Sequence, residues 1–67
     1  MLNMTERSKA FLQKNIPEVL NMEKKRDALT AIYDFIDDNG FAPPNFLYYN
    51  KLGKEAQDVY DDLYANN

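Results

Sequence analysis

Apolar positions recur at helical spacing in three stretches of the chain, and the first follows Thr5. Its apolar residues return about once per helical turn, at Phe11, Leu12, Ile16, Val19 and Leu20. The Thr5 hydroxyl can accept a hydrogen bond from a first-turn N–H, as an N-cap does. Pro17 interrupts the stretch, because proline lacks the N–H donor that a helix interior needs. The pattern therefore predicts a helix from about Thr5 that breaks or kinks between residues 15 and 17.

The second stretch predicts the clearest helix, over about residues 22–39. It begins with the wholly charged run Glu23–Asp27, which suits a solvent-exposed start. Gly40 predicts its end, because glycine adopts the left-handed conformation of a helix terminus without steric cost. The residues expected on its buried face are Met22, Ala28, Leu29, Ile32, Tyr33, Phe35 and Ile36.

The segment GFAPPNFLYYN, residues 40–50, is the only one that departs from helical rhythm. Its two prolines exclude a continuous helix. Two interpretations of the chain after these prolines stay open: a short helix over residues 45–52 closed by Gly53, or a last helix that Asn50 caps and that tolerates Gly53 in its first turn.

The third helix is expected to run to about Tyr64 and then fray. Its apolar stripe is Leu52, Ala56, Val59, Tyr60 and Leu63. No stretch alternates as a strand does. We predict an all-α fold, a small antiparallel bundle of three to four helices, with residues 1–67 as a single helical domain.

Composition removes several classes of chemistry. The 67 residues include no histidine and no cysteine, so the commonest general base and the usual zinc ligands are missing. No phosphate-binding or dinucleotide-binding glycine motif occurs, and no apolar run suits a signal peptide or a membrane span. We expect a cytoplasmic protein that is not an enzyme, with no cofactor, no metal ion and no membrane partner.

Charge is distributed unevenly along the chain. Residues 1–33 carry six basic and four acidic side chains, and residues 34–67 carry two basic and seven acidic ones. The acids form two Asp-x-x-Asp-Asp clusters, at residues 34–38 and 58–62, each in the last turns of a predicted helix, where the helix dipole disfavours them. One interpretation is that antiparallel packing brings Asp61 and Asp62 to Lys24–Arg26, and brings Lys51 and Lys54 to the first cluster. The other is an acidic patch kept for a cationic partner.

Nine aromatic side chains are many for this length, and Phe11, Phe35 and Tyr60 among them fall on predicted core stripes. Tyr48 and Tyr49 differ, because adjacent side chains point in divergent directions and at most one can be fully buried. Exposed tyrosine is typical of protein-binding surfaces. The candidate partner-binding residues are Phe46, Tyr48, Tyr49, Asp34, Asp37, Asp38, Asp61 and Asp62.

The nine residues NFLYYNKLG, 45–53, resemble a segment of the immunity proteins of nuclease colicins. Those proteins are four-helix inhibitors that use a Tyr-Tyr pair and acidic side chains against a toxin. The resemblance implies an inhibitory role for Tyr48 and Tyr49. It covers only this segment, and the acids of the present chain fall on different helices relative to it.

The sequence thus predicts a small non-enzymatic interaction protein: a regulator, inhibitor or adaptor. Its partner would be another protein or a second copy of the chain that buries the same aromatics. The alternatives are a nucleic-acid-binding domain that uses Lys24–Arg26, or an acidic mimic of nucleic acid. The first is disfavoured because three adjacent bases splay around a helix and form no stripe.

Overall fold

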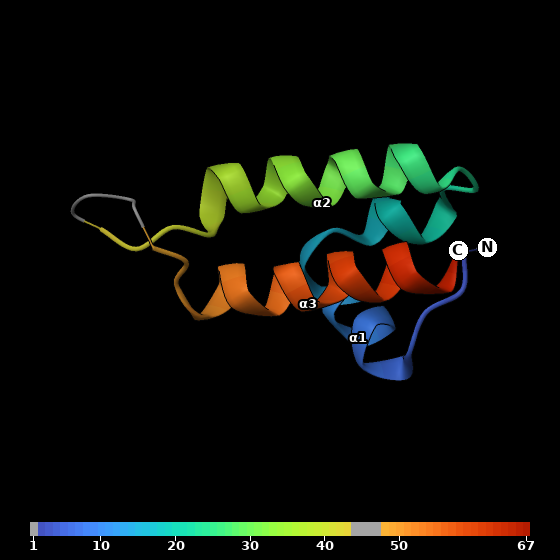
Figure 1. The fold of residues 1–67 in the computed structure, drawn as a ribbon, viewed down its shortest axis with the longest axis horizontal. Helices are drawn as coiled ribbons and strands as arrows, with labels where there is room; N and C mark the ends of the chain where they lie inside the picture. The colour runs from blue at the N-terminus through green and yellow to red at the C-terminus, as the bar shows by residue number, and fades with distance from the viewer. Residues whose placement is uncertain (1, 44–47) are drawn as a thin grey trace.

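The computed structural model describes residues 2–43 and 48–67, and within them the chain is all-α (Figure 1). Three α-helices and one 3₁₀-helix follow in the order α1 (Glu6–Asn15), η1 (Pro17–Asn21), α2 (Lys25–Asn39) and α3 (Lys51–Asn66). The described residues include no strand, only an isolated β-bridge between Phe41 and Tyr49. The molecule is elongated, about 37 × 20 × 20 Å.

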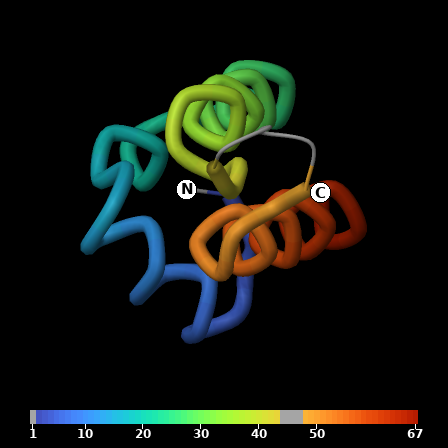
Figure 2. Tube along the Cα trace, turned by 90° about the vertical axis from the view of Figure 1, so that its left-hand side faces the viewer, coloured from blue at the N-terminus to red at the C-terminus, as the bar shows by residue number. Residues whose placement is uncertain are grey.

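Helices α2 and α3 run antiparallel along the long axis, with both chain ends at one end of the molecule (Figure 1). Helix α1 and η1 lie on one side of this pair, α1 against α3 and η1 against α2 (Figure 2). The core fills the space between them, and its fully buried side chains include Leu12, Val19, Ile32 and Leu63. The predicted all-α fold class is confirmed.

Both signals that bound the first helix act as predicted. Thr5 is the N-cap of α1, and its hydroxyl accepts a hydrogen bond from the Ser8 N–H at 3.3 Å. Helix α1 ends at Asn15, and Pro17 starts η1, where its missing N–H leaves no bond unmade. The predicted break between residues 15 and 17 is therefore confirmed.

Helix α2 differs from its prediction at its start and on its buried face. It begins at Lys25 rather than near residue 22, because Met22 caps η1 in an extended conformation and Lys24 is also extended. Ala28, Leu29, Ile32 and Ile36 are buried as predicted. Tyr33 was placed on the buried face, and this was wrong: it is 63% exposed, since one residue past Ile32 is a turn of about 100° around the helix.

Helix α2 ends at Asn39, as predicted, but not by the predicted mechanism. Gly40 has φ −96° and ψ 1°, so it does not adopt the left-handed conformation. Gly40 is buried and its backbone meets that of Gly53 at the start of α3. Glycine is required here by close packing between the two helices rather than by backbone conformation.

Asn50 caps the last helix, so the second of the two interpretations of this region is confirmed. Its side-chain oxygen accepts a hydrogen bond from the Gly53 N–H at 2.7 Å. Helix α3 continues to Asn66, and the predicted fraying after Tyr64 was wrong. Asn67 instead donates to the carbonyls of Leu63 and Asn3 and accepts from the Asn3 N–H, which joins the two ends of the chain.

Candidate interaction surface

A short backbone pairing holds Tyr48 at the end of the α2–α3 hairpin. The Ala42 N–H donates to the Tyr48 carbonyl and the Asn50 N–H donates to the Gly40 carbonyl, both at 2.8 Å. These two bonds flank the bridge between Phe41 and Tyr49. The backbone from Tyr48 to Asn50 is therefore fixed to the residues that follow α2.

The two tyrosines of the pair have different environments, as predicted. Tyr49 is half-buried: its ring packs edge-on against Phe41, with centroids 5.2 Å apart, and its hydroxyl donates to Gln57 Oε1 at 3.1 Å. Tyr48 is 77% exposed. With Lys54 these three rings line a shallow hollow of about 560 Å³, which we call the aromatic end. Phe46, the third predicted aromatic, lies outside the described residues.

The predicted acidic residues do not form one surface with the tyrosines. Asp34, Asp37 and Asp38 are exposed in the second half of α2, toward the aromatic end. Asp61 and Asp62 lie ten and eleven residues beyond the start of α3, about 15 Å or more along its axis. The structure thus places the second cluster toward the opposite end of the molecule.

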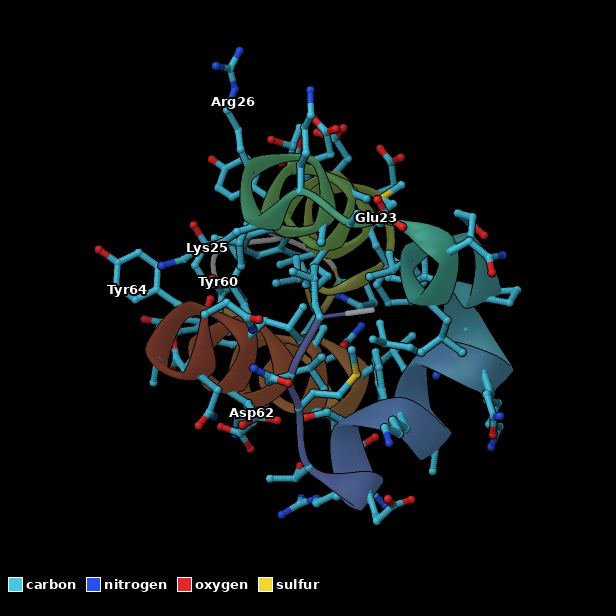
Figure 3. All side chains as sticks on the ribbon, turned by 90° about the vertical axis from the view of Figure 1, so that its right-hand side faces the viewer. Glu23, Lys25, Arg26, Tyr60, Asp62 and Tyr64 are labelled. Atoms are coloured by element: carbon cyan, nitrogen blue, oxygen red, sulfur yellow. The ribbon has the colours of Figure 1, made fainter. Side chains whose placement is uncertain are left out.

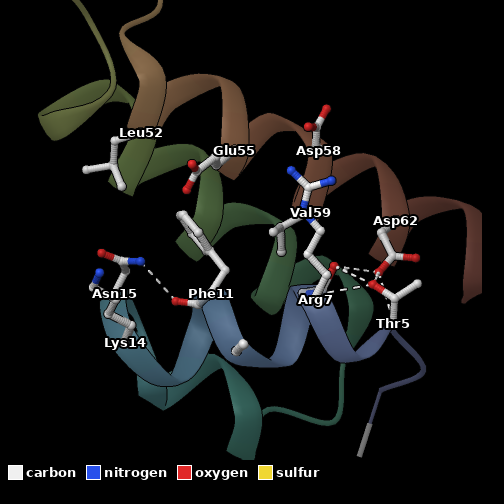
Figure 4. Close-up of a pocket in the computed structure, with 12 residues that line it drawn as sticks. Thr5, Arg7, Phe11, Lys14, Asn15, Leu52, Glu55, Asp58, Val59 and Asp62 are labelled. Carbon is white, nitrogen blue, oxygen red and sulfur yellow. Dashed lines mark hydrogen bonds between the residues drawn. The ribbon is translucent and has the colours of Figure 1, made fainter.

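Asp62 faces α1 and joins its N-terminus to α3 (Figure 4). Its Oδ2 accepts three hydrogen bonds: from the Ser8 hydroxyl at 2.6 Å, the Thr5 N–H at 2.9 Å and the Thr5 hydroxyl at 3.0 Å. The Ser8 bond, followed by the Thr5 N–H, lowers the pKa of Asp62 below its ordinary value of 3.8. Asp62 therefore has a structural role, which the sequence did not reveal because Thr5 and Asp62 lie far apart in it.

A groove of about 650 Å³ runs between α1 and α3, beside the hydrogen bonds that join Asp62 to Thr5 and Ser8 (Figure 4). Its floor is apolar, with Phe11 and Val59, while Arg7 lies on the α1 side and Glu55 and Asp58 on the α3 side. Opposite charges thus face each other across it. The groove presents no single sign of charge to a ligand.

The basic residues at the start of α2 do not pair with the acids of α3. Among the described residues the one ion pair joins Lys9 and Glu6 within α1, so neither of the charge pairings between α2 and α3 considered from the sequence forms an ion pair there. The Lys25 ammonium instead lies 4.2 Å from the centre of the Tyr64 ring, and Arg26 extends away from the molecule (Figure 3). Asp62 does not face the basic residues of α2, because it lies on the side of α3 that meets α1.

Sequence reasoning missed a second hollow, of about 500 Å³, on the flank of α2 and α3. It is lined by Lys25, Arg26, Leu29, Thr30, Tyr33 and Tyr60. The sequence pattern did not reveal this hollow because it placed Tyr33, which lines the hollow, in the core. We call these six residues the flank hollow.

Comparisons with known proteins give no family for this chain. No protein-family model matches it, and neither a curated protein nor a solved structure does. None of the described helices combines the length and apolar character needed to cross a membrane. Within residues 2–43 and 48–67, acidic side chains do not gather into a set that could hold a metal ion.

Proposed function

We propose that the chain is a small antiparallel helical bundle that acts in the cytoplasm as a non-enzymatic interaction protein and binds another protein through its aromatic end. One observation carries the proposal: Tyr48 is 77% exposed although its backbone carbonyl accepts a hydrogen bond from the Ala42 N–H. A ring on a fixed backbone loses less conformational entropy when a partner covers it than a ring on a free backbone does. Such rings are the commonest hot spots of protein interfaces.

The surroundings of Tyr48 support the same proposal. Phe41 and Tyr49 supply apolar area beside it, and Lys54 adds a cation at the rim. Asp37 and Asp38 are exposed near the same end of α2 and would favour a partner with basic side chains around an apolar pocket. We leave Asp61 and Asp62 out of the proposed surface, because they lie toward the other end of α3.

Affinity capture from the cells that express the protein tests the proposal. The bait would be the wild-type chain, Tyr48→Ala, or Tyr64→Ala as a matched control, because Tyr64 is also exposed, at 61%, but lies at the other end of α3. We expect one or more proteins to be retained by wild type and by Tyr64→Ala and lost with Tyr48→Ala. Equal recovery by all three baits would contradict the proposal, as would no recovery above an unrelated helical bait.

A further inference from the structure

One exposed face of α2 has a symmetric distribution of charged and apolar residues. Arg26, Thr30, Tyr33 and Asp37 are spaced by four, three and four residues, which places them in one row along the helix. All four side chains are exposed. Along the helix the row has a cation, a small residue, an aromatic residue and an anion. Thr30 is as far from Arg26 as Tyr33 is from Asp37.

A row of this kind is complementary to itself when reversed. If a second α2 packs antiparallel against the first, with a two-fold axis between Thr30 and Tyr33, Arg26 of each copy lies opposite Asp37 of the other. Tyr33 of each copy then lies opposite Thr30 of the other. Because the contact is isologous, each interaction occurs twice.

The flank hollow supplies a place for the incoming ring. Four of its six residues, Arg26, Leu29, Thr30 and Tyr33, have the i, i+3, i+4, i+7 spacing that forms a hole for a side chain of a facing helix. The hole is centred between Leu29 and Thr30. In the antiparallel register that pairs Arg26 with Asp37, Tyr33 of the second copy is the residue opposite that centre.

The charge layout of α2 supports the same occupant. Its bases lie at the positive end of the helix dipole and its acids at the negative end, an unfavourable order for an isolated helix. Within the described residues no ion pair between helices offsets it. An antiparallel α2 from a second copy would place opposite charges beside both ends of the helix and so offset this unfavourable order of charges.

We propose that the chain self-associates as a two-fold symmetric dimer through this face of α2, with Tyr33 of each copy in the flank hollow of the other. The partner is a second copy of the chain. The dimer goes beyond the proposed function and does not use Tyr48, so either can fail while the other stands. The contact is at the small end of protein interfaces, so the dimer should be weak and sensitive to salt.

Analytical ultracentrifugation over a wide concentration range at low salt, with a set of charge variants, tests the dimer. Arg26→Asp places like charges opposite each other and should weaken dimerisation roughly tenfold or more. The double swap Arg26→Asp/Asp37→Arg restores opposite charges and should recover most of the lost affinity. Arg7→Asp is the matched control, because it changes the net charge equally on exposed α1 and should leave dimerisation unchanged.

Tyr33→Ala should also weaken dimerisation about tenfold, with the helical circular dichroism of every variant unchanged. A chain that is monomeric at all concentrations would overturn the proposal. So would a dimer that Arg26→Asp and Arg7→Asp weaken equally, or one that the double swap does not recover. Arg26→Asp, Tyr33→Ala and Arg7→Asp leave the aromatic end and its neighbouring acids Asp37 and Asp38 unchanged, so the capture experiment with Tyr48→Ala keeps its own outcome.

Discussion

Gly40 and Gly53 touch through their backbones, and this contact closes the α2–α3 hairpin at its aromatic end. A methyl group at Gly53 would overlap the Gly40 carbonyl oxygen and lie 2.8 Å from the carbonyl carbon and 2.9 Å from Cα. A methyl at Gly40 would lie 2.8 Å from the Ile36 carbonyl oxygen and 3.0 Å from Gly53 Cα. These atoms are backbone and cannot rotate away. The start of α3 must move away from Gly40 to admit a methyl at Gly53, and the end of α2 must also distort to admit one at Gly40.

Gly53→Ala should therefore destabilise the protein although it places the best helix former in a helix. Overpacking costs about 1–3 kcal/mol or more, against about 1 kcal/mol gained in helix propensity. We expect a net loss in the free energy of unfolding by urea denaturation. Lys54→Ala is the control, because it is the next residue and exposed. A Gly53→Ala variant more stable than Lys54→Ala would show that the helices are not in contact there.

Asp62 should stabilise the attachment of α1 to α3 in a pH-dependent way. Its pKa is lowered in the folded protein, so its contribution is complete above the ordinary pKa of 3.8 and is lost as pH falls through the lower pKa of the folded protein. Asp62→Asn should reduce the free energy of unfolding by about 1 kcal/mol at neutral pH, after screening by solvent. The difference from wild type should shrink below about pH 4, measured by urea denaturation at several pH values.

The neighbouring Asp61 provides the control for Asp62. It is exposed and accepts one hydrogen bond, from Gln57 on its own helix. Asp61→Asn should change stability by less than about 0.5 kcal/mol at any pH. Equal effects of the two substitutions would mean that general acidity of α3, and not the Asp62 cap, stabilises the fold.

Asn50 joins the start of α3 to the end of α2. Its Oδ1 caps α3 and its Nδ2 donates to the Asn39 carbonyl at 2.9 Å. Asn50→Ala should cost about 1–2 kcal/mol in thermal or urea unfolding. Asn50→Asp keeps the capping oxygen and loses only the donor, so its cost should be smaller. The reverse order would contradict the assigned cap.

Ile32 and Tyr33 should respond oppositely to truncation, although the sequence pattern placed both in the core. Ile32 is fully buried, so Ile32→Ala should cost about 2–5 kcal/mol, enough to unfold much of so small a domain. Tyr33→Ala should cost less than about 0.5 kcal/mol when unfolding is measured on dilute protein. A large loss with Tyr33→Ala would place its ring in the core of the monomer.

The sequence predicted several helix boundaries correctly because those boundaries have a local chemical cause. Thr5 and Asn50 carry capping oxygens, and Pro17 lacks an N–H, so these signals act within one turn of the chain. The all-α class follows equally from local spacing. The predicted start of α2 was too early because Glu23 and Lys24 are compatible with a helix. Their residue types do not indicate that the chain leaves η1 in an extended conformation.

The candidate site was predicted only in part because it depends on rotation and on distant contacts. Adjacency predicted that one of Tyr48 and Tyr49 would be exposed, but not which one, because that depends on the packing of Tyr49 against Phe41. The separation of Asp61 and Asp62 from the tyrosines required knowing that α2 and α3 are antiparallel and that Asp62 faces α1. Tyr33 was assigned to the core because apolar spacing alone does not say how wide the buried face of α2 is.

The most direct test of the interaction proposal is photo-crosslinking inside the cells that express the protein. A benzophenone amino acid would replace Tyr48, with the same substitution at exposed Gln13 on α1 as the control. We predict that position 48 forms a covalent product with a different protein, identified by mass spectrometry, and that position 13 does not. Products that are the same at both positions, or that contain only a second copy of this chain, would contradict a binding role for the aromatic end.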